Sequence, residues 1–458
     1  MADFRQCKRW LPTGALQWII VLAILLRVGS AVYQGDKVTP MPGTYDQVSY
    51  HALAERVAGG NGFSFAANWW PATRAGEPTA HWSFLYTSYI ALIYFIGGVH
   101  PLVPRLLQAI LCGALQPYLT YRIGARLFGT QLGLTASFLS ALYAYFVYYA
   151  GSLMTESFYI VAVLWALDTT LRLDDPSQSR SRWRWVEFGL GAGTAALLRQ
   201  TFIVLIPVLC LWLIWRRQSQ PKHAAPRREL FSGMALSVAV MLALITPWVV
   251  RNYRAFGLFP VLNTNSGYVL FWANHPIHGN TFIPVLPDNG SAYGELIPDR
   301  LRSLNEAALD KELFVLGLRE IAADPSRYAA LVSSRFSEFF KFWPSRDSAW
   351  ASNVARTSSF GFLIPFILIG MHAAWGRSRR EGADVHVRCD AAYPGMRQFA
   401  LLVLFISVYS AVHLLTWVLV RYRLPIDAVL VVFAGAGLGK AASLAAVAQR
   451  RRLQTVSS

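Results

Sequence analysis

Acidic and basic residues recur beside the ends of apolar segments, and their side chains suit the transfer of a group from a phosphate. The acids are Asp46, in MPGTYDQVSYHALAERV, and Glu156, in GSLMTESFY. The basic residues are Arg105, Arg199, Arg251, Arg254, Arg421 and Arg423. A carboxylate accepts the proton of an attacking hydroxyl, and arginine grips phosphate through two nitrogens and stays charged when desolvated. A phosphate leaving group needs such cations as its charge develops.

The same residues also have plain structural interpretations. Interfacial arginines often form ion pairs or reach lipid headgroups, and Asp46 is equally suited to cap a helix. The occurrence of the whole set at one face favours a binding site. After Asp46, Tyr50, Leu53, Ala54 and Val57 follow at i, i+3, i+4 and i+7 spacing. This spacing predicts a helix that lies along the membrane with Asp46 at its N-terminal end.

Composition places these residues in a membrane protein. Of 458 residues, 54% are hydrophobic and 15% are charged, whereas soluble domains carry about 25% charged residues. Apolar runs long enough to cross a bilayer recur along the chain. The net charge of +17 resides in short loops between these runs, which follows the positive-inside rule and argues against nucleic acid as the partner. The four cysteines suggest neither a disulfide framework nor a zinc site.

The topology depends on residues 83–96, which are apolar but number only 14. That length favours an interfacial or re-entrant helix. With this segment outside the bilayer, the basic loops near 122–126, 172–184, 216–228, 377–397 and 450–452 fall on the side of Lys8 and Arg9, and both termini are cytoplasmic. The predicted spans are 14–34, 101–121, 131–150, 156–172, 185–199, 200–215, 230–250, 352–373, 398–419 and 425–445.

The predicted fold is an all-α integral membrane bundle of about ten transmembrane helices, one domain over residues 1–458. Two large outer loops, 35–100 and 251–351, carry interfacial helices, among them one over 305–321. Five tryptophans are expected as interface anchors: Trp69, Trp70, Trp82, Trp343 and Trp350.

The order of the motifs resembles the GT-C membrane glycosyltransferases, in particular the bacterial branch near protein O-mannosyltransferases and the lipid A aminoarabinose transferase. The resemblance runs from about residue 14 to 445 and rests on YDQVSYHALAERVAGGNGFS, HWSFLYTSYIALIYFIGG, PRLLQAIL, YRIGARLFG, GSLMTESFY, LLRQTFIVLIP, TPWVVRNYRAFGLFP and RYRLPIDAVLVVFAG. Each piece is weak by itself, and the ordered series is more specific.

This resemblance implies a polyprenyl-phosphate-linked sugar donor and an acceptor on the outer face of the cytoplasmic membrane. Asp46 matches the catalytic acid of the first loop and is expected to act as general base, and Glu156 matches the acid of the second loop. Arg251, Arg421, Arg423 and Arg199 are expected to hold the donor phosphate, and Tyr50, His81, Asn265 and Tyr268 to contact substrate. Direct displacement predicts inversion at the sugar. Burial of Asp46 near a second acid is expected to raise its pKa.

Departures from the family pattern leave questions open. Gln47 stands where many relatives have Glu, and Met154 and Thr155 precede Glu156 without the second Asp of an Asp-x-Asp motif. Metal dependence is therefore undecided. The HPIH segment, His275 to His278, could bind a transition metal, but without a third visible ligand its two histidines are more simply explained as loop residues. A non-catalytic relative and a lipid or solute transporter remain as rivals, although no inverted repeat is visible. The sugar, the acceptor (glycolipid, glycan or protein) and the oligomeric state are not encoded in any short motif.

Overall fold

The computed structural model describes residues 14–41, 44–218, 227–286, 291–346, 348–383 and 396–456. Several residues of the basic segments discussed above, and two of the cysteines, lie outside these ranges: Lys8, Arg9, Lys222, Arg388, Cys7 and Cys389.

Helices stand at each of the expected membrane spans. They are α1 (Ala15–Gln34), α4 (Leu102–Phe128), α5 (Thr130–Leu142), α6 (Ala144–Ala150), α7 (Glu156–Leu173), α9 (Arg182–Leu198), α10 (Leu205–Gln218), α11 (Arg227–Phe256), α17 (Phe362–Ala383), α18 (Met396–Leu415) and α19 (Leu424–Val456). Short helices lead into or connect them: α8 (Pro176–Ser179), η2 (Gln200–Val204), α16 (Trp350–Arg356), η6 (Thr357–Gly361) and η7 (Val420–Arg423).

Within the described part of the chain, six helical segments are long and apolar enough to cross a membrane, or seven if the bent pair α5 and α6 is one span. The remaining bundle helices are shorter or more polar. α9 has 17 residues, and α7 carries Glu156, Asp168 and Arg172 within 18 residues. The multi-pass membrane bundle is thus confirmed, while the number of ten spans stays a prediction.

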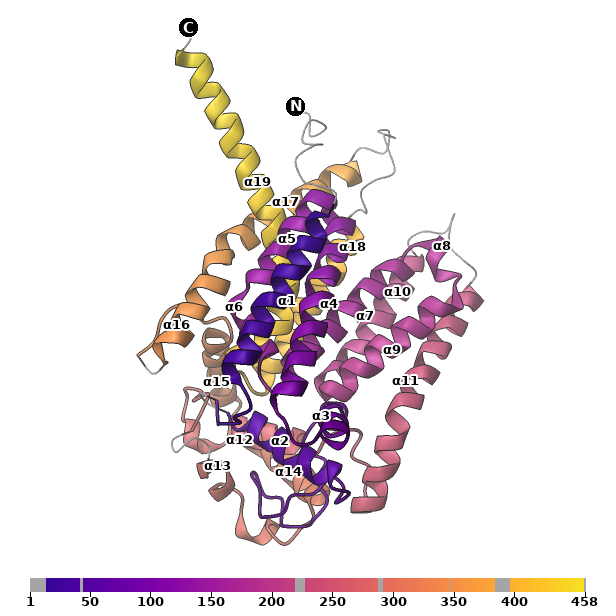
Figure 1. The fold of residues 1–458 in the computed structure, drawn as a ribbon, viewed down its shortest axis with the longest axis vertical. Helices are drawn as coiled ribbons and strands as arrows, with labels where there is room; N and C mark the ends of the chain where they lie inside the picture. Colours follow the sequence, from indigo (N-terminus) through magenta and orange to yellow (C-terminus); the bar gives the residue numbers. More distant parts are fainter. Residues whose placement is uncertain are drawn as a thin grey trace.

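The two long loops that the sequence predicts on the outer side fold into a layer of short helices at one end of the bundle. This layer contains α2 (Asp46–Ala58), α3 (Phe84–Gly97), α12 (Ser266–Asn274), η3 (Pro276–His278), α13 (Ser291–Glu295), η5 (Asp299–Leu301), α14 (Glu306–Ala323) and α15 (Pro325–Phe339). In Figure 1 the layer lies at the lower end, whereas α1 begins and α19 ends at the upper end. We call the lower end the loop end and the upper end the far end. α3 is short, as its 14 apolar residues predict.

α2 forms where the sequence predicts it. Tyr50, Leu53 and Ala54 are buried on one face and Val57 is half-buried, in agreement with the predicted apolar face. Asp46 is the first helical residue, so its negative charge complements the partial positive charge of the helix N-terminus. Tyr45 occupies the N-cap position without a side-chain cap bond, so Asp46 is not a capping residue.

The break between α5 and α6 is stabilised by a buried arginine of α1. Tyr143 adopts an extended conformation and the two helices meet at 56°. The broken helix leaves the last carbonyls of α5 without intrahelical donors. Arg27, fully buried, donates to Ser140 O at 3.2 Å and to Ala141 O at 3.4 Å. The arginine therefore supplies the donors that the missing helical turn does not.

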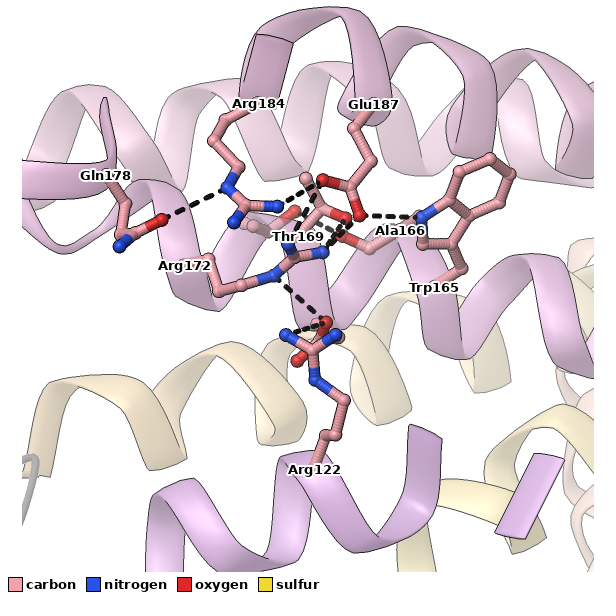
Figure 2. A network of polar contacts seen from close by, with 10 residues as sticks. Arg122, Trp165, Ala166, Thr169, Arg172, Gln178, Arg184 and Glu187 are labelled. Atoms are coloured by element: carbon pink, nitrogen blue, oxygen red, sulfur yellow. Dashed lines mark hydrogen bonds and ion pairs between the residues drawn. The ribbon is translucent and has the colours of Figure 1, made fainter. Parts of the chain in front are cut away.

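An ion-pair network joins α4, α7 and α9 towards the far end (Figure 2). Arg172 Nε lies 3.0 Å from Asp168 Oδ2, and Arg122 Nη2 lies 3.3 Å from the same oxygen. Glu187 accepts from Arg172 Nη1 at 3.0 Å and from Arg184 Nη1 at 2.8 Å. These pairs fix the end of α7 that lies opposite Glu156, and so help to set the position of Glu156 at the loop end.

The tryptophans predicted as interface anchors behave differently from one another. Trp350 and Trp343 are 80% and 41% exposed, which suits an interfacial position. Trp82 is 5% exposed and contacts Tyr50 edge-on, so the anchor prediction is wrong for this residue. The loop that carries it folds over the bundle end and turns the indole inward.

Candidate active site

Four charged residues from four elements meet at the loop end. Asp46 begins α2, Glu156 begins α7, Arg199 follows α9 and Arg421 lies in η7. We call these four residues the charged tetrad. Each stands at or next to the end of an element, where its side chain can reach past its own helix.

The tetrad is joined by direct ion pairs. Arg421 Nη1 donates to Asp46 Oδ2 at 2.5 Å, and Arg199 Nη2 donates to Glu156 Oε1 at 2.6 Å. Arg421 Nη1 also lies 3.6 Å from Glu156 Oε1, which links the two pairs. Arg199 Nε donates to Thr155 Oγ1 at 3.1 Å, and Tyr422 lies against the Arg199 guanidinium, 5.3 Å from the ring centre. Two acids and two arginines thus share one small volume.

Arg421 determines the direction in which the pKa of Asp46 is shifted. Burial raises the pKa of this carboxyl, but the charge and hydrogen bond of Arg421 outweigh burial and hold the pKa below the ordinary value of 3.8. The expectation of a raised pKa is therefore wrong for the free protein. The reason is that Arg421 lies against Asp46, whereas the negative charge of Glu156 is itself compensated by Arg199.

The tetrad borders a cavity of about 470 Å³. Asp46, Arg199 and Arg421 line it directly, and Glu156 supports the two arginines from behind. Much of the remaining wall is aromatic, with side chains from both outer loops and from the segment after α18: Tyr50, Trp70, Trp82, Tyr268, Trp272, Tyr293 and Trp417. Trp70 and Trp272 stack with ring centres 5.4 Å apart. Trp70, predicted as an interface anchor, thus faces the cavity instead.

All four residues predicted to contact substrate line this cavity: Tyr50, His81, Asn265 and Tyr268. His81 lies with its ring edge-on to Trp82 and Tyr268, and its Nδ1 is 3.1 Å from Thr264 O. Because a carbonyl only accepts, Nδ1 carries the proton and Nε2 is left as an acceptor. Burial lowers the pKa of His81, so the ring is neutral near pH 7.

Two predicted phosphate ligands lie outside the cavity. Arg251 donates to Thr79 O at 2.8 Å and to Phe63 O at 3.1 Å, and thereby fastens the end of α11 to the first outer loop. Arg423, fully buried, donates to Asp427 Oδ1 at 2.9 Å, and its guanidinium lies 3.6 Å from the centre of the Phe360 ring. Both guanidinium groups are committed to these structural contacts and not to the cavity wall.

Other cavity residues were not singled out from the sequence. Gln200 accepts from Asn263 N at 3.1 Å and donates to Asn265, so it connects the tetrad side to the second outer loop. Its position next to Arg199 in LLRQTF was the available signal. His413 also lines the cavity, with Nδ1 3.2 Å from Trp417 O. A histidine in the apolar run of α18 is the kind of intramembrane ionisable residue that indicates a site.

The possible metal ligands among the described residues suit pairing with arginine better than binding of a divalent cation. Among the described residues no three His, Cys, Asp or Glu side chains gather at one point. Both tetrad carboxylates bind guanidinium groups, whereas Ca²⁺ or Mg²⁺ requires several oxygen ligands. In the HPIH segment, His278 Nε2 is 2.7 Å from Trp272 O and its Nδ1 accepts from Ile283 N at 3.2 Å. Both ring nitrogens of His278 are therefore already used.

Part of the chain matches a known protein family by sequence. Residues 83–250 match the family model described as dolichyl-phosphate-mannose-protein mannosyltransferase. That segment contains Glu156 and Arg199 but neither Asp46 nor Arg421. No curated protein matches the chain by sequence.

Among solved structures, the archaeal oligosaccharyltransferase AglB from Archaeoglobus fulgidus, in complex with an inhibitory peptide and a dolichol-phosphate, aligns over 96% of this chain with a TM-score of 0.57 and 13% identity. The apo form of the same enzyme aligns over 98% of the chain with the same score and identity. The chain has the GT-C fold. This result confirms the fold that the motif order predicts.

This chain spans about half the length of the AglB structures, 52% and 53% respectively. ArnT from Cupriavidus metallidurans bound to undecaprenyl phosphate aligns over 96% of this chain and 80% of its own, with 16% identity and a TM-score of 0.42.

Proposed function

We propose that this GT-C protein is a glycosyltransferase that moves a sugar from a polyprenyl-phosphate donor to a hydroxyl group of an acceptor. The observation that carries the proposal is the cavity wall on which Asp46 lies beside Arg421 and Arg199. The donor class is supported by the family match over residues 83–250 and by the dolichol-phosphate in the AglB complex.

Arg199 and Arg421 are the proposed ligands of the donor phosphate. Both line the cavity and both are braced by Glu156, so their charge is oriented before the donor arrives. Val204, Val412 and Leu419 provide apolar wall near the membrane helices for the first units of the polyprenyl chain. The sugar then faces the aromatic wall together with His81 and Asn265, whose polar groups suit hydroxyls.

In the proposed reaction the acceptor oxygen attacks the anomeric carbon while its proton passes to a carboxylate oxygen of Asp46. The bond between that carbon and the phosphate oxygen breaks, and its electron pair leaves with the phosphate. Arg199 and Arg421 stabilise the charge that develops on the leaving group. One direct displacement inverts the configuration at the anomeric carbon.

The ion pair with Arg421 makes Asp46 a weak base until the donor binds. A phosphate beside Arg421 competes for the guanidinium and adds a negative charge near Asp46. Both effects raise the pKa of the carboxyl towards the range in which a general base works at neutral pH. Donor binding thus activates the base.

The proposed location is the cytoplasmic membrane, with the cavity facing the outside. Basic residues on α4, α7, α9 and α10, including Arg122, Arg172 and Arg216, lie towards the far end, away from the cavity. Because positively charged segments stay on the cytoplasmic side, this distribution favours a far end in the cytoplasm and a loop end outside.

The test is sugar transfer by the purified protein in nanodiscs, with a panel of polyprenyl-phosphate sugars and a membrane glycan extract as acceptor source. Asp46→Asn is expected to lower kcat by about a hundredfold or more without loss of donor binding. Glu77→Gln is the matched control, since Glu77 lies in the same outer loop, outside the cavity, with its side chain 43% exposed. A parallel reaction with chelator is expected to proceed at the same rate.

The outcomes separate the rival functions. Equal transfer by wild type and Asp46→Asn removes Asp46 from the base role. Donor binding without transfer in both proteins indicates a non-catalytic relative. Absence of donor binding, combined with movement of a lipid or solute across the membrane of vesicles that contain the protein, indicates a transporter.

A further inference from the structure

Two buried carboxylates on α14 have no place in the proposed chemistry. Glu306 and Asp310 are 6% and 9% exposed and lie one turn apart, so they share one face of the helix. No Lys, Arg or His side chain among the described residues lies within ion-pair distance of either. An unpaired buried carboxylate is costly for folding. The hydrogen-bond partners of the two carboxylates show which segments of the chain they hold together.

Glu306 joins the two outer loops. It accepts from Thr73 Oγ1 at 2.8 Å and from Ala80 N at 2.7 Å, both in the segment between α2 and α3. It also accepts from Thr264 Oγ1, in the segment between α11 and α12. One carboxylate thus holds segments that are far apart in the sequence.

Asp310 holds the start of α12. It accepts from Gly267 N at 2.7 Å, from Tyr268 N at 3.4 Å and from Ser266 Oγ at 3.2 Å. A negative charge at a helix N-terminus is favourable. The two helices approach so closely that a Cβ on Gly267 would lie 1.7 Å from Asp310 O. Only glycine allows this contact, so α12 and α14 form a tight unit here.

The segments held in this way carry one wall of the cavity. His81 directly follows Ala80, and Asn265 and Tyr268 lie within two residues of Gly267. His81, Asn265 and Tyr268 all line the cavity. The segments also bind each other, because Asn265 Nδ2 and Asn263 Nδ2 donate to His81 O at 3.2 and 3.3 Å. A shift at Glu306 or Asp310 would therefore move His81 and Asn265 relative to the charged tetrad.

We propose that Glu306 and Asp310 are positioning residues that hold His81 and Asn265 at the cavity wall and thereby set the affinity for the sugar part of the donor. This inference rests on the proposed glycosyltransferase function. The two carboxylates act on donor binding, not on the transfer step, since neither lines the cavity.

The same arrangement makes donor affinity depend on pH. Burial raises the pKa of Asp310 to about 6, although its three hydrogen bonds lower it, and the neighbouring charge of Glu306 adds to the rise. Among the described residues, Tyr268 also interacts electrostatically with Asp310, and its phenol stays neutral in this range. Protonation weakens the carboxyl as an acceptor, so donor affinity falls as the pH drops through about 6.

This loss of affinity is distinct from unfolding. A carboxyl whose folded pKa is raised binds its proton more readily in the folded state than in the unfolded state. Between its folded value and the ordinary value of 3.8, acidification therefore increases the contribution of Asp310 to the free energy of unfolding. A rise in donor KM near pH 6 without a fall in Tm reports on positioning.

The experiment compares Glu306→Gln and Asp310→Asn with Glu312→Gln, an exposed acid on another face of the same helix. Donor KM, kcat and Tm are measured on purified protein in nanodiscs at pH values on both sides of 6. We expect both buried variants to raise donor KM about tenfold, as loss of a hydrogen bond to a charged group implies, with kcat near that of wild type. Asp310→Asn removes the pH dependence of KM, and Glu312→Gln changes nothing.

The possible failures are distinguishable. If wild type transfers sugar and both buried variants keep its donor KM, or lower kcat alone, the positioning role is refuted while the proposed function stands. If wild type transfers no sugar from any donor in the panel, the proposed function fails before the variants are compared. If a variant does not fold, Glu306→Asp and Asp310→Glu retain the charge at a changed length and are expected to show the same selective rise in KM.

Discussion

Asp46 and Arg421 share a cavity wall although 375 positions separate them in the sequence. Their pairing makes each residue dependent on the other. The guanidinium keeps the carboxylate ionised in the free protein, and the carboxylate holds the guanidinium at the cavity wall. In the proposed reaction a donor phosphate competes with Asp46 for Arg421, and this competition would couple donor binding to the base strength of Asp46.

The first prediction concerns the pH dependence of this pair. Because the pKa of Asp46 is lowered in the folded protein, its contribution to stability is present above the unfolded value of 3.8 and is lost as the pH falls through the lower folded pKa. Asp46→Asn should lower Tm at neutral pH, and the difference from wild type should shrink as the pH falls below 3.8. Differential scanning fluorimetry of both proteins over this range measures it. A difference that stays constant would contradict the stabilising role of the pair.

At the scale of elements, the break between α5 and α6 determines the path of the chain towards Glu156. α6 leads directly into the segment that precedes α7, so the 56° bend sets where that helix begins. Arg27 lowers the free-energy cost of the break, because its guanidinium donates to the carbonyls that the break leaves without helical partners. In the apolar interior of a bundle such carbonyls have few other donors.

The second prediction follows from this contact. Arg27→Met keeps the length of the side chain but removes the donors, and each carbonyl left without a partner costs about 1–3 kcal/mol. The variant should therefore have a clearly lower Tm in detergent, whereas Arg254→Met, an exposed arginine near the end of α11, should not. Equal Tm values for the two variants would show that other donors replace Arg27.

At the scale of the molecule, two clusters of charged residues lie at opposite ends of the bundle. The charged tetrad and its cavity are at the loop end, and the ion-pair network of Arg122, Asp168, Arg172 and Glu187 lies towards the far end (Figures 1 and 2). α7 connects them, with Glu156 at its first residue and Arg172 in its last turn. A rigid helix anchored at both ends keeps the tetrad in place relative to the membrane.

The third prediction tests the orientation of the molecule. In a cysteine-free background, Ala75→Cys at the loop end should react with a membrane-impermeant maleimide in intact cells, because Ala75 is exposed in the first outer loop. Arg182→Cys, exposed at the start of α9, should react only after the membrane is permeabilised. The reverse pattern would place the cavity in the cytoplasm and refute transfer at the outer face.

The sequence by itself determined the multi-pass membrane class and the position of the helices, and it singled out many of the residues that line the candidate site. Apolar runs and helical periodicity reflect local interactions along the chain, so α1, α2 and α14 lie close to where they were predicted. Asp46, Glu156, Arg199 and Arg421 were recognisable because charged residues at the ends of apolar segments are costly there without a function.

Only the tertiary structure decided which arginines face the cavity and in which direction the pKa of Asp46 is shifted. Arg251 and Arg421 have the same chemistry and similar sequence contexts, yet one binds carbonyls of a folded loop and the other binds Asp46. The pKa of Asp46 and the positioning role of Glu306 and Asp310 likewise depend on partners far away in the sequence. The physical reason is that hydrogen bonds and ion pairs act over a few ångströms, and those distances exist only after the loops have folded over the bundle.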